Sequence, residues 1–123
     1  MGLKRGIVRA AVVQAAPVIM DRQGTMERIR KLTGEAAEQG ARIILFPEAF
    51  IPCYPRGLSF GSVVGNRTME GRKDWSRYYE NSIDVPGPET GQLGELAAEH
   101  GIYLSIGVME HVGYKNYRTY MKV

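Results

Sequence analysis

The sequence has few of the residues from which disulfides, metal sites and membrane spans are built. Cys53 is the single cysteine among 123 residues, and only two histidines occur. One cysteine forms no intrachain disulfide and no Cys-rich zinc site, and it is typical of a reducing compartment such as the cytoplasm. No run of about 18 apolar residues is present, which argues against a transmembrane helix. The basic residues in 1–6 precede no signal-type apolar stretch, so we do not expect a secretory signal. We expect residues 1–6 to be a flexible N-terminus.

The sequence also lacks a concentrated basic region, although its net charge is +3. Lys and Arg outnumber Asp and Glu by 8 to 5 in residues 1–50 and by 3 to 1 in the last 23, but not in between. No basic stripe with interleaved aromatic residues appears, so we expect no nucleic-acid partner. Hydrophobic residues make up 44% and charged residues 24%, as in ordinary globular domains.

What the sequence does contain is an alternation of strand and helix patterns. Apolar runs at 7–14, 43–46 and 102–108 predict three mostly buried strands. Apolar residues at helical spacing predict an amphipathic helix over 22–39. They predict a second helix after Pro86-Gly87-Pro88, with a stripe of Leu93, Leu96, Ala97 and His100. Asp21 is the expected N-cap of the first helix, and Gly40 and Gly101 are the expected helix ends. A helical piece at 74–79 lies within a long loop, and 114–123 is expected to begin a fourth strand.

This order of elements predicts an α/β layer structure with helices over the sheet. With no covering element after its last strand pattern, such a sheet has an open edge and an uncovered face. We therefore expect residues 1–123 to form part of a larger domain. The long connection at 47–88 is of a kind that is usually functional.

Glu48 is the first candidate for chemistry. It follows the apolar run 43–46 and precedes a second apolar stretch, 49–52, at the end of a predicted strand, where ligands bind in open α/β folds. Burial there would raise the pKa of its carboxyl, as a general base requires. The alternative is that Glu48 accepts hydrogen bonds from loop backbone and only orders the turn. The pattern alone leaves both open.

Residues 40–55 resemble the first active-site motif of the nitrilase branch of the carbon–nitrogen hydrolases. The motif comprises a glycine, an apolar strand, Phe46-Pro47-Glu48 and then Tyr54-Pro55. The resemblance covers residues 7–113, including the strand at 8–14 and the segments 54–57, 65–68 and 83–89. Cys53 departs from the motif, which has Gly there, and this questions the local turn because Cys tolerates positive φ poorly.

The resemblance implies the N-terminal part of a four-layer α-β-β-α sandwich. It also implies hydrolysis of an organic nitrile to a carboxylic acid and ammonia, with a Glu, a Lys and a Cys and without metal or organic cofactor. Glu48 then corresponds to the general base that activates the Cys nucleophile, and Tyr54 lies near the substrate pocket. The parent enzyme is expected to be a cytoplasmic homo-oligomer.

The Lys and the Cys of this family come after the strand that residues 114–123 begin, so the resemblance implies a chain truncated within that strand. Lys115 and Lys122 come too early to match the catalytic Lys and are expected to be solvated. We therefore expect the isolated chain to be inactive. Cyanide hydratase and amidase activities of the same superfamily remain open, as does a non-enzymatic fragment that binds a partner chain.

Other reactive side chains have structural interpretations. Cys53 is expected to be a small buried hydrophobe rather than a substitute nucleophile. His100 is expected at a helix end and His111 in a turn, so neither is expected to form a Cys–His dyad with it. The aromatic residues Trp75, Tyr78 and Tyr79 are expected to be core or interface residues rather than a binding site.

Overall fold

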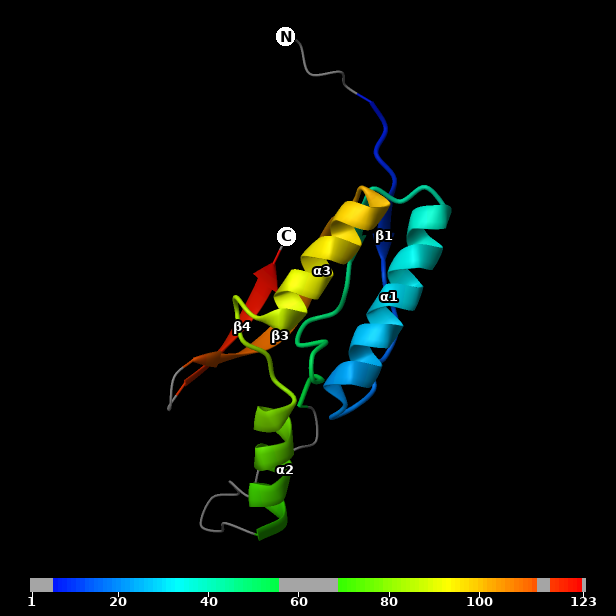
Figure 1. Ribbon diagram of the computed structural model, residues 1–123. Coiled ribbons are helices and arrows are strands. Elements are labelled where there is room, and N and C mark those ends of the chain that lie inside the picture. Colours follow the sequence, from blue (N-terminus) through cyan, green and yellow to red (C-terminus); the bar gives the residue numbers. More distant parts are fainter. Residues whose placement is uncertain (1–5, 56–68, 113–115, 123) are drawn as a thin grey trace.

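The computed structural model describes residues 6–55, 69–112 and 116–122, with an α/β fold as predicted (Figure 1). The described residues form a four-stranded sheet of order β1-β2-β3-β4. Strands β1, β2 and β3 are parallel, and β4 is antiparallel to β3. The strands are β1 (Ala10–Val12), β2 (Ile43–Leu45), β3 (Tyr103–Val112) and β4 (Asn116–Lys122), and the helices are α1 (Arg22–Glu38), α2 (Met69–Glu80) and α3 (Pro88–His100).

Helix α1 begins and ends where the sequence predicts. The Asp21 carboxylate accepts a hydrogen bond of 2.9 Å from the Gly24 backbone N–H, which satisfies one of the unpaired donors of the first turn. Gly40 has a φ of +87°, in the left-handed region that glycine adopts without steric cost. The predicted apolar stripe faces the core, since Met26 and Ile29 are buried.

Helix α3 ends where the sequence predicts, and it begins at Pro88, within the Pro-Gly-Pro segment that is expected to precede it. Pro88 occupies the first helical position, where its missing N–H costs no hydrogen bond. The Thr90 hydroxyl oxygen accepts a hydrogen bond of 2.8 Å from the Gly87 N–H. Gly101 ends the helix in the left-handed conformation, with a φ of +61°.

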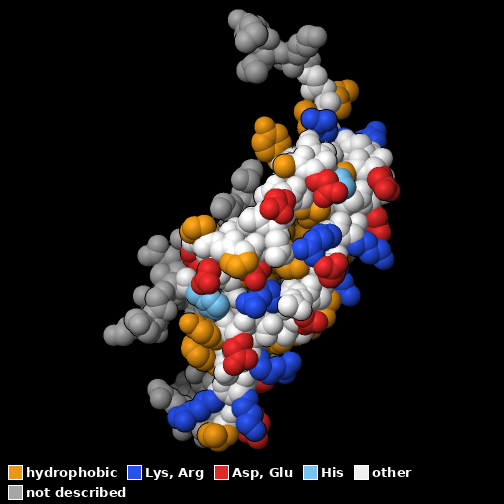
Figure 2. Space-filling model, viewed as in Figure 1, with side chains coloured by type: hydrophobic (Ala, Val, Ile, Leu, Met, Phe, Trp, Pro, Cys, Tyr) orange, Lys and Arg blue, Asp and Glu red, His pale blue; other side chains and the backbone are white. Residues whose placement is uncertain are grey.

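The two faces of the sheet differ in what covers them. Ile44 and Leu104 are adjacent across β2 and β3, and both are buried on the side of α1 and α3. The main core lies between these helices and the sheet and comprises Met26, Ile29, Ala41, Ile44, Phe46, Phe50, Ile51, Ile83, Leu96, Ile102, Leu104, Ile106 and Val108. Figure 2 shows that charged side chains of both signs are interspersed over the outer side of these helices.

Among the side chains that the structure describes, the opposite side of the sheet exposes four large apolar ones, which we call the open face: Val12, Ile43, Leu45 and Tyr103. Val12 and Tyr103 are each 69% exposed, and Ile43 and Leu45 are each 37% exposed. The prediction of mostly buried strands is therefore wrong for β1 and only half right for β2. Apolar runs indicate burial on both faces, whereas the described residues cover only one. Within the described part of the chain, the uncovered face that the element order predicts is present.

Helix α2 is longer than the predicted piece at 74–79, and its aromatic residues divide between core and surface. Tyr78 is buried, and its hydroxyl donates a hydrogen bond of 2.9 Å to the backbone oxygen of Cys53. Trp75 is partly exposed and stacks on Tyr79 with a ring-centroid distance of 5.4 Å.

Several predictions concern residues outside the described part of the chain. Of the flexible N-terminus predicted for 1–6, only Gly6 is among the described residues. The segment 65–68 and Lys115 lie outside them, as do residues 56 and 57 of the segment 54–57. Lys122 is the last residue of β4, and its side chain is not among those described.

Candidate active site

The candidate site is built on a bulge that interrupts the pairing of the β2 segment with β3. The Phe46 N–H donates to the Ser105 oxygen at 2.8 Å, and the Phe50 N–H donates to the Gly107 oxygen at 2.7 Å. The four residue steps from Phe46 to Phe50 therefore lie opposite only two steps, from Ser105 to Gly107. The extra residues, within 47–49, must loop out of the ladder. Glu48 lies in the middle of this bulge, directly beyond the end of β2.

The bulge lies on the open face of the sheet. Ile106 and Val108 face α3, so Gly107 between them faces the opposite side. A Cβ atom built on Gly107 would lie 2.6 Å from the Cα of Glu48, which places the backbone of the bulge against β3 on that side. Neither Gly107 nor the bulge is apparent from the sequence pattern.

Backbone conformation also distinguishes the bulge. Ala49 has a φ of +48°, which non-glycine residues adopt rarely and at an energetic cost, and its side chain is buried. Such strained residues persist only where the surroundings determine them, and they cluster at functional sites. The hydrogen bonds of Phe46 and Phe50 on either side supply that constraint.

The side chain of Glu48 is exposed. The described residues therefore do not bury it, although burial is one of the two interpretations of its place in the sequence. The cause is the open face, because no described element covers the side of the sheet on which the bulge lies. Tyr54, six residues after Glu48 in the chain, is also exposed, at 59%. The structure thus leaves both residues accessible.

Cys53 is a buried residue, as expected for a structural cysteine. It is 4% exposed and packs with Met20 and Tyr78. Burial raises the pKa of its thiol, and a hydrogen bond with the backbone of Met20 lowers it by less. Its φ is not positive, so the replacement of Gly by Cys does not strain this turn.

The prediction for His111 is wrong, since this residue lies within β3 and not in a turn. The strand continues beyond Val108 because the segment around Ile83 pairs with Glu110 on one side and β4 pairs on the other. The two ring nitrogens of His111 contact an Asp84 carboxylate oxygen at 3.1 Å and the Tyr79 backbone oxygen. His100 is the last residue of α3, as predicted. These contacts leave a Cys–His dyad without support.

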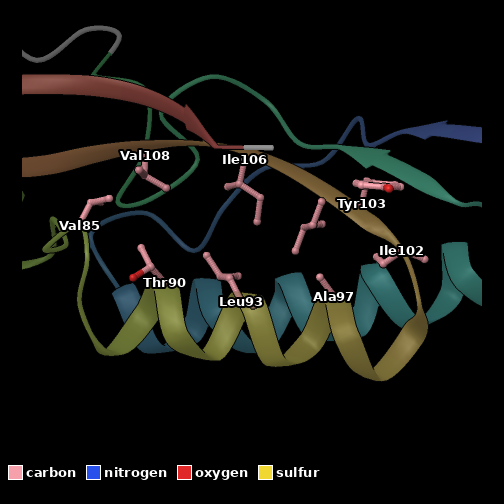
Figure 3. Close-up of a pocket in the computed structure, with 10 residues that line it drawn as sticks. Val85, Thr90, Leu93, Ala97, Ile102, Tyr103, Ile106 and Val108 are labelled. Carbon is pink, nitrogen blue, oxygen red and sulfur yellow. The ribbon is translucent and has the colours of Figure 1, made fainter.

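An apolar hollow of about 280 Å³ lies between α3 and β3, lined by residues such as Leu93, Ala97, Ile106 and Val108 (Figure 3). Because it opens on the helix side of the sheet, it is separate from the bulge with Glu48. Within the described ranges, no group of three or more His, Cys, Asp and Glu side chains could hold a metal ion. None of the helices described is long and apolar enough to cross a membrane.

Comparisons with known proteins agree on one family. The sequence profile of the carbon–nitrogen hydrolases matches residues 9–123. The chain is 48% identical over 112 residues to a bifunctional nitrilase/nitrile hydratase of Lupinus angustifolius, covering 91% of this chain and 32% of that protein. It is 50% identical over 111 residues to an aliphatic nitrilase of Sinorhizobium fredii (strain HH103), and the match covers 90% of this chain and 36% of that protein. It is 46% identical over 113 residues to nitrilase 2 of Arabidopsis thaliana, and the match covers 92% of this chain and 33% of that protein. The chain thus spans about a third of each relative.

Proposed function

Because the chain belongs to the carbon–nitrogen hydrolase family, we propose that it forms part of a nitrilase and supplies Glu48 as the general base. The reaction is the hydrolysis of an organic nitrile to a carboxylic acid and ammonia. The observation that carries this proposal is the bulge, which presents a carboxylate beyond the end of β2 in a chain similar to proteins named nitrilases.

The proposed chemistry needs a Cys and a Lys from the rest of the protein. Glu48 takes the proton of the Cys thiol, and the thiolate adds to the nitrile carbon to give a thioimidate. Water adds to this carbon, ammonia leaves, and a second water releases the carboxylic acid and regenerates the thiol. The Lys ammonium stabilises the negative charge that develops in these additions, and Tyr54 contacts the substrate.

The open face supports this arrangement. It exposes Val12, Ile43, Leu45 and Tyr103 on the same side as the bulge. In the four-layer sandwich that we propose for the whole protein, a second sheet covers these side chains. The same cover removes water from around Glu48, which strengthens its electrostatic interactions in the site.

The test is ammonia release from aliphatic and aromatic nitriles. The intact protein that carries this chain should release ammonia, whereas residues 1–123 alone should not. Glu48→Gln should abolish the release, because an amide accepts no proton from the thiol. Glu38→Gln, at the surface end of α1, is the matched control and should retain the parental rate. Parental activity in Glu48→Gln would contradict the assigned role.

The reaction product distinguishes the enzyme alternatives. One relative is named a bifunctional nitrilase/nitrile hydratase, so amide release is a second candidate outcome for this chain. An amide as the sole product indicates a hydratase, and turnover of amides without turnover of nitriles indicates an amidase. We propose a small-molecule substrate, no cofactor, and a cytoplasmic homo-oligomer.

A second candidate function is a non-enzymatic fragment that binds a partner chain. The open face favours it, because exposed apolar surfaces of this kind recruit other chains. Sedimentation of residues 1–123 tests it directly. A folded monomer at all concentrations would count against partner binding, whereas association with a full-length relative would support it.

A further inference from the structure

Gly107 lies directly against the bulge that carries Glu48. A Cβ atom at this position would lie 2.5 Å from the backbone nitrogen of Ala49 and 2.6 Å from the Cα of Glu48. It would also lie 2.8 Å from the backbone oxygen of Pro47. Cβ atoms in proteins do not approach other atoms this closely, and the three neighbours belong to backbone rather than to a flexible side chain. Any residue other than glycine therefore requires the bulge to move.

The bulge can move only within residues 47–49. On one side, Phe46 is fixed by its hydrogen bond to Ser105. On the other, Phe50 is bonded to Gly107, and the Ile51 oxygen accepts a hydrogen bond of 2.9 Å from the Met109 N–H. Phe46, Phe50 and Ile51 are also buried in the main core. A displacement forced at position 107 is therefore concentrated on Glu48 and its two neighbours.

We infer that Gly107 is a positioning residue that sets the distance between β3 and the Glu48 carboxylate. This inference rests on the proposed role of Glu48 as the general base. A methyl group at position 107 lifts the bulge away from the sheet and moves the carboxylate off the nucleophile. It leaves the binding groups contributed by other elements in place.

The experiment compares Gly107→Ala with Gly91→Ala in the intact protein. Gly91 lies on the exposed side of α3, and nothing lies within 4 Å of a Cβ built on it. For Gly107→Ala we expect kcat to fall by about 100-fold, as for a misplacement of about 1 Å, while KM changes less than about threefold. Gly91→Ala should leave both constants unchanged.

Hydrogen exchange supplies a second readout that does not depend on activity. Gly107→Ala should leave the protection of the Phe50 amide, which donates to the Gly107 oxygen, at the parental value, because the displacement is confined to residues 47–49. It should leave the protection of the Tyr103 amide, which donates to the Arg42 oxygen at 2.8 Å, at the parental value. A parental kcat, or a loss of protection at Phe50, in Gly107→Ala overturns the inference.

The failures of the two proposals are distinguishable. If Glu48→Gln retains activity, the proposed function fails whatever Gly107→Ala does. If Glu48→Gln is inactive and Gly107→Ala is fully active, only the positioning role fails. If Gly107→Ala does not fold, Ala49→Gly is the variant that tests the positioning of Glu48, because glycine loosens the bulge without introducing a clash. A lower kcat with unchanged thermal stability then supports the role, and an unchanged kcat overturns it.

Discussion

Replacing Arg22 should loosen the junction of α1, α2 and α3. The guanidinium donates hydrogen bonds of 3.1 Å to the backbone oxygens of Glu80 and Ser82. It also forms an ion pair of 3.1 Å with Glu89, in which the side chains are 33% and 15% exposed. Hydrogen bonds from charged donors contribute about 1.5–3 kcal/mol when buried, and partial exposure lowers this. We expect Arg22→Ala to lower the free energy of unfolding by about 2–3 kcal/mol.

Two further variants separate geometry from charge. Arg22→Lys keeps the charge but loses the planar fork that contacts two carbonyl oxygens and a carboxylate, so we expect a loss of about 1 kcal/mol. Lys31→Ala, on the exposed side of α1, is the control and should change stability by less than about 0.5 kcal/mol. Urea denaturation of the intact protein measures all three. The reasoning is refuted if Arg22→Ala is no more destabilising than Lys31→Ala.

Two more predictions concern the segment that follows the bulge. Tyr78→Phe removes the hydroxyl that donates to the Cys53 oxygen and should lower the free energy of unfolding by about 1 kcal/mol. Tyr103→Phe, on the open face, is the control and should not lower it. Thermal unfolding compares the two variants. Because burial raises the pKa of Cys53, iodoacetamide should react more slowly with it in the native than in the urea-unfolded protein at pH 8. The unfolded chain loses this proton at lower pH, so the thiol's contribution to stability is present below about pH 8.5 and declines above it. Equal alkylation rates in the two states would contradict the burial argument.

The elements that the sequence predicts best are those with local signals. Asp21 and Gly40 mark both ends of α1, and Gly101 marks the end of α3, so these boundaries are predicted nearly as observed. These residues act through their own backbone geometry and need no distant partner. The same holds for the presence of β2, a short apolar run directly after a helix end.

The features that the sequence predicts poorly depend on distant partners. His111 was expected in a turn, whereas the pairing of Glu110 with Ile83 extends β3 past it. The burial of β1 and β2 was overestimated because an apolar run does not say whether one face or both faces are covered. Residues 81–83 and 108–111 are far apart in the sequence, and no local pattern connects them.

The candidate site shows the same division. Glu48 and Tyr54 were predicted from a motif, and their roles remain predictions that the experiments above test. The bulge itself was not predicted, because Ala49 carries no signal for a positive φ. Gly107 was read only as part of a strand, since the need for glycine arises from the bulge that packs against it.

The order of the strands in the sheet has a consequence for folding during synthesis. Each of β2, β3 and β4 lies next to the strand that precedes it in the chain. Each of these three strands therefore finds its partner already synthesised when it leaves the ribosome. Three residues separate β3 from β4 and 30 separate β1 from β2, whereas 57 separate β2 from β3. Closing the longest of these connections loses the most entropy, so we expect the pairing of β3 with β2 to be the slowest step. We expect this sheet to grow strand by strand from its N-terminal edge.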